Sequence, residues 1–221
     1  MAYTFHQNLC PPGLANNPNR AINRVKYITV HTTSGYKLDS DAENHANFLY
    51  TGSGGHKTSW HYTVDAENVW QSFEDTRACW HAGDGEGDGN MSSLGVKICV
   101  NDRHRFSEAC GNAAELIAGL MVRHNLDMDR VVQHNFWNGK ECPKELRTGE
   151  WDVTWSDFMS YVNTAQTFLL DTLGEEADNV SDWASEAWEW GLKRGVIDSS
   201  DPHGYMSKEA VIALMYKVLS N

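Results

Sequence analysis

Two short β-branched segments of this chain each end in a histidine, and this feature constrains its fold and chemistry most. One segment runs from Arg24 to Thr32 and contains His31, and the other runs from Arg130 to His134. Short runs of this kind favour β-strands, which hold their side chains rigidly. Cys142 follows the second histidine by eight residues and precedes Pro143, which restricts the backbone. Two strand ends and one loop are therefore able to bring three metal-binding side chains together.

Two imidazoles and one thiolate suit zinc, which prefers tetrahedral nitrogen and sulfur ligands. A hydrolytic zinc site uses three protein ligands and leaves the fourth position for water. The pattern is compatible with one metal ion held by His31, His134 and Cys142. A second interpretation stays open at this point, because the same three residues could be ordinary buried polar residues with satisfied hydrogen bonds.

The remaining patterns alternate between strands and helices and predict an α/β fold. We expect strands over 59–65, 69–73 and 94–100, and helices over 41–50, 112–125 and 155–173. Residues 81–90 carry four glycines and are expected to form a surface loop, as are residues 135–147. Within the strand 94–100, Lys97 and Cys99 share one face, and the apolar Leu94, Val96 and Ile98 share the other.

The length of 221 residues allows one full domain and a smaller remainder. We predict a main domain over 1–173, an acidic linker over 174–180 and a small helical domain over 181–221. Two helix-like stretches, 182–194 and 207–219, make up the small domain. A unit of about 40 residues does not easily stabilise itself. It is expected to pack on the main domain, to bind a partner or to form a homo-oligomer.

Charge and composition exclude several classes of function. Lys and Arg number 18 against 30 Asp and Glu, which gives a net charge of −12. This charge argues against nucleic-acid binding by phosphate neutralisation and against adhesion to anionic lipid. No apolar run approaches the ~20 residues that span a bilayer, so no membrane insertion is expected. The first residues lack the pattern of a secretory signal, which predicts a cytoplasmic location.

Five cysteines without a CxxC pair are expected to be mostly free thiols in a cytoplasm. They also leave open a redox or metal-storage protein, which would bind several metal ions or contain a reactive thiol pair.

Five segments occur in one order along the chain: Ile28-Thr-Val-His-Thr-Thr33, Ser59-Trp-His-Tyr-Thr-Val-Asp65, Ala78-Cys-Trp-His-Ala-Gly83, Leu94-Gly-Val-Lys-Ile-Cys-Val-Asn101, and Val132 to Asn135 with Lys140 to Pro143. Together they closely resemble the type 2 zinc-dependent N-acetylmuramoyl-L-alanine amidases, the family of phage endolysins and peptidoglycan recognition proteins. The resemblance covers about residues 20 to 150. It implies a mixed central β-sheet flanked by helices and one zinc ion in a surface groove. It also implies hydrolysis of the amide between N-acetylmuramic acid and L-alanine in bacterial peptidoglycan.

The resemblance assigns roles to individual residues. His31, His134 and Cys142 match the zinc ligands, and Lys140 matches a lysine beside the metal. A cation there would polarise the scissile carbonyl or stabilise an oxyanion. The alternative for Lys140 is an exposed loop lysine.

The resemblance also places two groups of residues along the substrate groove. Trp60 and His61 match a strand that lines it, and Trp80, His81 and Gly83 match its rim. For His61 the alternative is a buried histidine bonded to the backbone, and for Trp80 it is a core position.

Lys97 departs from the family pattern. Close relatives carry Glu at this position, where the resemblance implies a general base for the attacking water. A lysine with a pKa near ~10.4 is protonated at neutral pH and does not accept a proton. Lys97 therefore predicts an impaired enzyme, an unusually desolvated neutral lysine, or an electrostatic role together with Lys140. The main alternative function is a non-catalytic peptidoglycan-binding protein.

As an endolysin, the protein would accumulate in the host bacterial cytoplasm before it reaches the cell wall. The segment 182–219 faintly resembles a unit of the S-layer-homology type, which implies binding to a secondary cell-wall polymer. A simple helical hairpin is the alternative.

Overall fold

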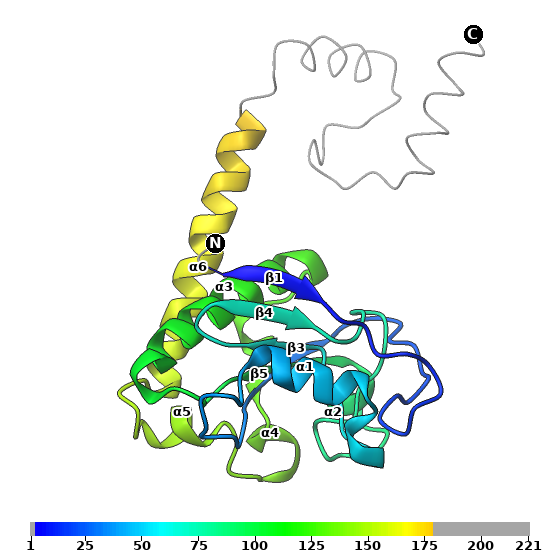
Figure 1. Cartoon of the computed structure of the whole chain (residues 1–221). Helices are drawn as coiled ribbons and strands as arrows, with labels where there is room; N and C mark the ends of the chain where they lie inside the picture. The colour runs from blue at the N-terminus through cyan, green and yellow to red at the C-terminus, as the bar shows by residue number, and fades with distance from the viewer. Residues whose placement is uncertain (1–2, 179–221) are drawn as a thin grey trace, which may run out of the picture. The chain divides into compact units, whose positions relative to one another are not determined.

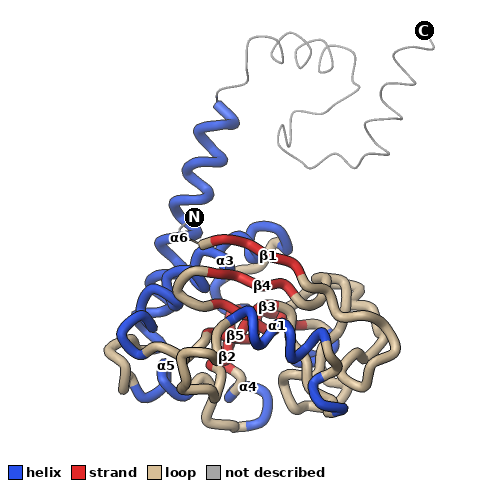
Figure 2. Tube along the Cα trace, in the orientation of Figure 1, coloured by secondary structure: helices blue, strands red, loops and turns tan. Residues whose placement is uncertain are grey.

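A six-stranded mixed β-sheet forms the centre of the computed structural model, which describes residues 3–178. The strand order is β1-β4-β3-β5-β2-β6, and every neighbouring pair is parallel except β3 with β4 (Figures 1 and 2). The expected α/β fold with a mixed sheet flanked by helices is confirmed. The strands are β1 (Thr4–Gln7), β2 (Tyr27–Thr32), β3 (Tyr62–Val64), β4 (Asn68–Gln71), β5 (Ser93–Ile98) and β6 (Val131–Gln133).

Helices of very different lengths connect these strands. Short 3₁₀ turns cover Ser53–Gly55, Arg103–Arg105 and Met128–Arg130. Within the described residues, no helix combines the length and the apolar character that a membrane span requires. The α-helices are α1 (Ala42–Tyr50), α2 (Asp88–Met91), α3 (Phe106–His124), α4 (Asn135–Asn138), α5 (Lys144–Thr148) and α6 (Trp155–Asp178).

Capping residues determine where α1 begins and where α3 ends. Asp41 caps α1, because its carboxylate accepts a hydrogen bond of 2.9 Å from the backbone N–H of Asn44. Asn125 ends α3 in the left-handed conformation, with a φ of 51°, which asparagine tolerates better than most residues. The helix α3 starts at Phe106, six residues before the predicted start, because Phe106 and Cys110 extend its buried face.

The two faces of the sheet differ in polarity. Ile28, Val30 and Val96 lie on one face, in a hydrophobic core that also contains side chains of α3 and α6. The opposite face carries polar residues such as Thr29 and His31, and α1 packs over its β3 and β4 portion. Burial of the apolar face drives folding. Because the polar face over β2 and β5 is not part of this hydrophobic core, its side chains are available for a metal or ligand site.

Several predicted boundaries differ from the structure. The edge strand β1 was not predicted, and its side chains are mostly exposed, so it lacks a hydrophobic pattern. The expected loop 135–147 contains the short helices α4 and α5. The helix α6 continues past 173 to Asp178, because Glu175, Glu176 and Ala177 are good helix formers. It therefore runs through most of the predicted linker 174–180. The helical domain predicted over 181–221 lies outside the described residues.

All five cysteines are free thiols, and four of them are buried. Burial raises the pKa of Cys79 and of Cys99, so both remain protonated and unreactive at neutral pH. In the described residues, this arrangement does not favour the redox alternative.

Candidate metal centre and groove

His31, His134 and Cys142 meet on the polar face of the sheet. Each offers one ligand atom, these atoms lie within 4.8 Å of one another, and all three residues are buried. Parallel pairing of β2 with β6 explains the meeting of the two histidines, because Val30 is in register with Gln133. The backbone N–H of His134 continues this pairing with a hydrogen bond of 3.1 Å to the carbonyl of Val30.

The loop after α4 folds back and brings Cys142 to the histidines. The backbone N–H of Asn135 donates to the carbonyl of Cys142 at 2.9 Å, and the Asn135 side-chain amide donates to the carbonyl of Lys140 at 2.9 Å. The Sγ atom of Cys142 then lies 3.7 Å from Nδ1 of His31. Local hydrogen bonds thus hold the thiol beside the strand ends.

A chain of hydrogen bonds fixes which nitrogen of His31 faces the thiol. Nε2 of His81 lies 3.3 Å from the carbonyl oxygen of Ser93, which only accepts hydrogen bonds, so this nitrogen carries the proton. Nδ1 of His81 is then an acceptor for Nε2–H of His31, at 3.1 Å. The lone pair of His31 is consequently on Nδ1, which faces Cys142.

His134 has the same tautomer for a similar reason. Its Nε2 donates to the carbonyl of Ala82 at 3.0 Å, which leaves the lone pair on Nδ1. That Nδ1 atom is buried and has no hydrogen-bond partner among the described residues. An unpaired buried acceptor costs about 1–3 kcal/mol, and a metal ion would offset this cost. Two imidazole nitrogens with free lone pairs and a thiol therefore fit a zinc ion.

The electrostatics of the three side chains also suit a metal. Burial and nearby positive charges lower the pKa of His31 well below its ordinary value, and burial and Lys140 lower the pKa of His134 to about 4. Both rings are therefore neutral at pH 7, as ligation requires. Burial raises the pKa of Cys142, so the thiol is protonated at pH 7 without a metal. A bound metal ion would displace this proton and stabilise the thiolate.

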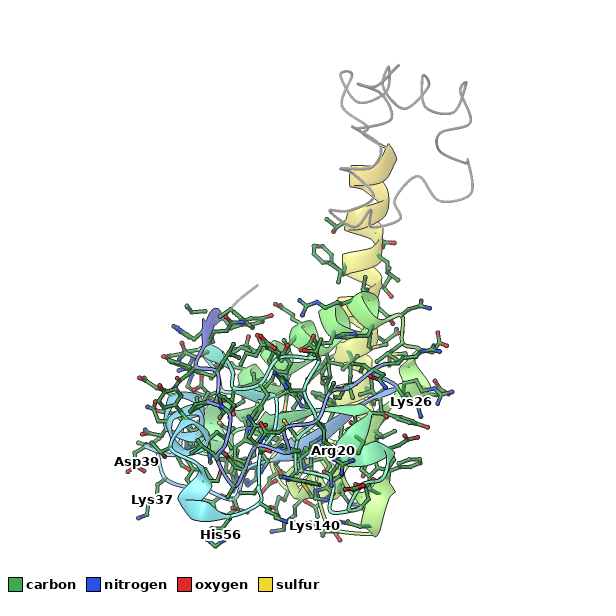
Figure 3. The ribbon with its side chains drawn as sticks, turned by 90° about the vertical axis from the view of Figure 1, so that its right-hand side faces the viewer. Arg20, Lys26, Lys37, Asp39, His56 and Lys140 are labelled. Carbon is green, nitrogen blue, oxygen red and sulfur yellow. The ribbon has the colours of Figure 1, made fainter. Side chains whose placement is uncertain are left out.

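A groove pocket of about 530 Å³ opens beside His134. We call it the first pocket. Trp80, His81 and Gly83 are among the residues that line it. Lys140 lies on its wall and is exposed, at the end of the molecule that also carries Lys37 (Figure 3). Their roles toward a substrate remain predictions.

Trp60 and His61 are adjacent in sequence but differ in their surroundings. Trp60 lines a second pocket of about 680 Å³, together with Lys97. His61 is fully buried, accepts a hydrogen bond from the backbone N–H of Gly95 at 2.9 Å, and donates to the carbonyl of Arg77 at 2.7 Å. Both ring nitrogens are used, so the geometry favours the alternative of a histidine bonded to the backbone.

Lys97 lies on the same face as the metal-binding side chains. It is the register partner of His31 in the pairing of β2 with β5, and its Nζ atom lies 3.7 Å from the centre of the Trp60 ring. Burial lowers the pKa of Lys97 to about 8. At pH 7 roughly nine in ten of these side chains remain protonated, so Lys97 is mainly a cation there.

Two asparagines that sequence analysis missed support the site. Asn138 donates to the carbonyl of Ala82 at 2.9 Å, the same oxygen that accepts a hydrogen bond from Nε2 of His134. Asn90 accepts hydrogen bonds of 2.8 Å from the backbone N–H groups of His81 and Ala82. Asn138 follows His134 by four residues, a spacing that places two side chains on the same face of a helix. The sequence therefore contains a signal for Asn138. No local pattern marks Asn90.

Comparison with known proteins agrees with this geometry. Residues 21–145 match the family model described as N-acetylmuramoyl-L-alanine amidase. Two similar proteins of Bacillus subtilis (strain 168) are the N-acetylmuramoyl-L-alanine amidases XlyA and CwlH. XlyA is 37% identical over 189 residues, which is 83% of this chain and 61% of XlyA. CwlH is 36% identical over 165 residues, which is 74% of this chain and 63% of CwlH.

The fold itself is similar to solved structures. The catalytic domain of XlyA superposes with a TM-score of 0.65 at 39% identity, over 72% of this chain and 99% of that one. The structure of PlyL gives a TM-score of 0.63 at 32% identity, over 72% of this chain and 96% of that one. A mixed α/β fold with a His-His-Cys centre defines the class of protein. The chain belongs to the N-acetylmuramoyl-L-alanine amidase family, and it spans about three fifths of the length of the two curated relatives.

Proposed function

We propose that this chain is a zinc-dependent peptidoglycan amidase that hydrolyses the bond between N-acetylmuramic acid and L-alanine. The observation that carries the proposal is the meeting of three donor atoms within 4.8 Å, one of which is a buried nitrogen without a partner. Zinc held by His31, His134 and Cys142 would supply Lewis acidity and lower the pKa of water. Family membership and similarity to the amidase XlyA support the same reaction.

The chain's own residues would divide the remaining tasks. His81 orients His31, and the carbonyl of Ala82 orients His134. Lys140 would bind the carbonyl oxygen of the scissile amide as negative charge develops on it. Trp80 and Gly83 would shape the pocket beside that amide. No carboxylate among the residues that line the second pocket matches the expected base, since Lys97 stands at that position.

The position of Lys97 favours a second candidate, a peptidoglycan-binding protein with little or no hydrolytic activity. General acid–base catalysis contributes about 10²–10⁴ in rate, and a protonated lysine does not supply it. The two candidates share the fold, the metal and the ligand class and differ only in turnover.

The experiment that tests the proposal compares wild-type protein with Lys97→Glu, both loaded with zinc, on purified bacterial cell walls. Amide hydrolysis liberates the amino group of alanine, which end-group labelling quantifies alongside the loss of turbidity. We expect slow release by the wild type and release about 10² or more faster by Lys97→Glu. Activity in the variant alone would identify the wild type as a binding protein. No release by either protein would refute the amidase assignment.

We further propose an endolysin role, supported by 39% identity to an endolysin from Bacillus subtilis of known structure. In this role the protein would act from the cytoplasm of the host bacterium on the cell wall at lysis. The segment 181–221 would attach the enzyme to a secondary cell-wall polymer or join two copies of the chain. Binding of the full chain to walls stripped of that polymer, compared with intact walls, tests the attachment.

A further inference from the structure

Four lysines line the first and second pockets in the described part of the chain. Lys57 and Lys140 line the first pocket, and Lys37 and Lys97 line the second. None of the four forms an ion pair with a described residue, although acidic residues outnumber basic ones by 30 to 18. Several cations outside these pockets are paired, for example Arg20 with Glu86, Lys26 with Asp88, Arg105 with Glu67 and Lys144 with Glu150.

Lys97 is the most constrained of these lysines. Its ammonium is partly buried and sits over the face of Trp60, at 3.7 Å from the ring centre. An aromatic face stabilises a cation but does not neutralise it. Desolvating an ammonium without a counterion is unfavourable. The site therefore favours an anion that enters the pocket.

Other groups around the second pocket suit a carboxylate. Burial lowers the pKa of His45 to about 4, so this ring is neutral at pH 7. Ser34 and Thr58 line the pocket with hydroxyls that can donate hydrogen bonds. Asp39 is the acidic side chain among the residues that line the second pocket, and no ion pair joins it to Lys97 in the described part of the chain.

We propose that the second pocket is a carboxylate-binding subsite, in which Lys97 pairs with a carboxylate of the peptide that extends from the scissile amide. This inference rests on the proposed function, because the peptide is the ligand only if the groove binds peptidoglycan. Lys97 then sets specificity: a peptide with a free carboxylate binds, and the same peptide with that group amidated binds weakly. Lys97 would thus bind the substrate at the position where the family resemblance implies a general base.

The test uses calorimetry on the zinc-loaded full chain with N-acetyl-L-alanyl-glutamate, its glutamate in either configuration, and with the same dipeptide amidated at both carboxyls. The variants are Lys97→Met, which removes the charge, and Lys97→Arg, which keeps it. Arg24→Met is the control, because Arg24 is exposed, lines neither pocket and also changes the net charge by one. Circular dichroism verifies that each variant is folded.

We expect the wild type and Arg24→Met to bind the acidic dipeptide at least about tenfold more tightly than the amidated one, as for a charge-assisted hydrogen bond. Lys97→Met should bind both forms equally weakly, and Lys97→Arg should retain most of the preference. Equal binding of the acidic dipeptide by wild type and Lys97→Met would overturn the proposal. So would a preference that disappears with a chelator but not with Lys97→Met, since the metal would then bind the carboxylate.

Failure of the amidase proposal can be distinguished from failure of the carboxylate-binding proposal. No bond is broken in the binding assay, so absence of alanine release from cell walls leaves the carboxylate preference measurable.

Discussion

His31 and Lys97 are register partners in the parallel pairing of β2 with β5, so their side chains leave the sheet side by side on the same face. One is a candidate ligand for a divalent cation, and the other is itself a cation at neutral pH. Their proximity also lowers the pKa of His31, because the ammonium disfavours a second positive charge after burial has already done so. This relationship would affect both metal binding and catalysis in the proposed amidase.

Repulsion between Lys97 and a divalent ion predicts that Lys97→Met raises zinc affinity. We expect an increase of several-fold, since like charges at this separation destabilise each other. Competition with a chromophoric chelator at pH 7 measures the affinity. Arg24→Met removes a distant charge and should have no effect. A lower zinc affinity in Lys97→Met would contradict the proximity of the two charges.

His81 is predicted to act through His31. Replacement of His81 by Phe removes the acceptor for Nε2–H of His31 and should weaken zinc binding about 10–100-fold. His81→Gln offers an amide oxygen in a similar place and should restore part of that loss. The same chelator competition gives both values. An unchanged zinc affinity in His81→Phe would show that His81 is not needed to orient the His31 ring.

Gly95 is required for the close approach of the His81 ring. A Cβ atom at Gly95 would lie 2.9 Å from Cγ of His81, which is closer than real contacts allow. Gly95→Ala should therefore destabilise the fold by about 1–3 kcal/mol, as measured by urea unfolding. Gly119, in α3, has open space around it, so Gly119→Ala should stabilise by about 0.5–1 kcal/mol. Equal effects of the two substitutions would be inconsistent with this packing.

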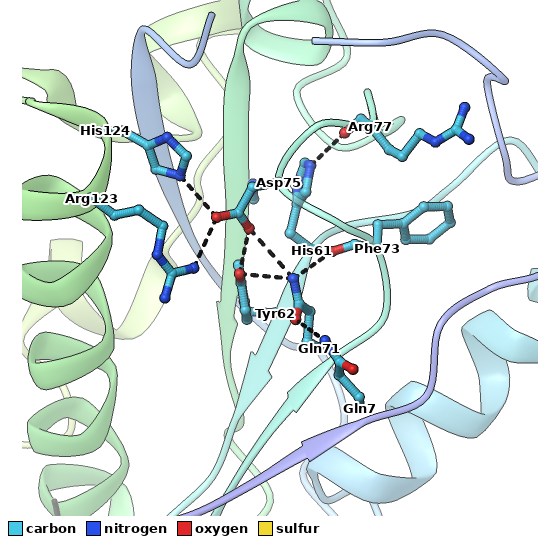
Figure 4. A network of polar contacts seen from close by, with 10 residues as sticks. Gln7, His61, Tyr62, Gln71, Phe73, Asp75, Arg77, Arg123 and His124 are labelled. Carbon is cyan, nitrogen blue, oxygen red and sulfur yellow. Dashed lines mark hydrogen bonds and ion pairs between the residues drawn. The ribbon is translucent and has the colours of Figure 1, made fainter. Parts of the chain in front are cut away.

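Asp75 joins the end of α3 to the hairpin of β3 and β4. Its carboxylate accepts hydrogen bonds from His124 at 2.8 Å, from Arg123 at 3.1 Å and from Tyr62 (Figure 4). Burial alone would raise the pKa of Asp75, but the hydrogen bonds from His124 and Tyr62 outweigh it and lower the pKa to about 2. The folded protein therefore holds this carboxylate in its charged form more strongly than the unfolded chain does.

A lowered pKa in the folded state means that the contribution of Asp75 is complete above the unfolded value of 3.8 and is lost as the pH falls toward 2. Asp75→Asn should destabilise by about 1–3 kcal/mol at pH 6, and the difference from wild type should shrink at pH 3. Urea unfolding with a chelator present isolates this effect from metal release. The exposed Asp129→Asn should change stability by less than about 0.5 kcal/mol. A pH-independent difference would contradict the network.

Much of the fold follows from residue patterns. Alternating apolar residues at Leu94, Val96 and Ile98 predict the strand β5 and the face on which Lys97 lies. The cap Asp41 marks the start of α1. His31 and His134 each end a β-branched run, so parallel pairing was enough to bring them together. The strand pattern and the helix cap are encoded locally, and the meeting of the two histidines depends only on the alignment of two strands, so the sequence was sufficient to predict them.

Other features depend on tertiary contacts that no local pattern encodes. The hydrogen bond between His31 and His81 joins residues 50 positions apart, and the sequence does not specify how either ring is turned. His61 has the same residue type and strand context as a groove residue, but its ring is turned to the backbone of Gly95 and Arg77. The Trp60 ring beneath Lys97 is likewise visible only in three dimensions.

Zinc content tests the central claim most directly. The purified full chain is dialysed against excess zinc, freed of unbound metal, and analysed by elemental mass spectrometry together with His134→Ala and Cys142→Ser. The account predicts about one zinc ion per wild-type chain and almost none in either variant. A wild-type chain without zinc, or variants that retain it fully, would contradict the account.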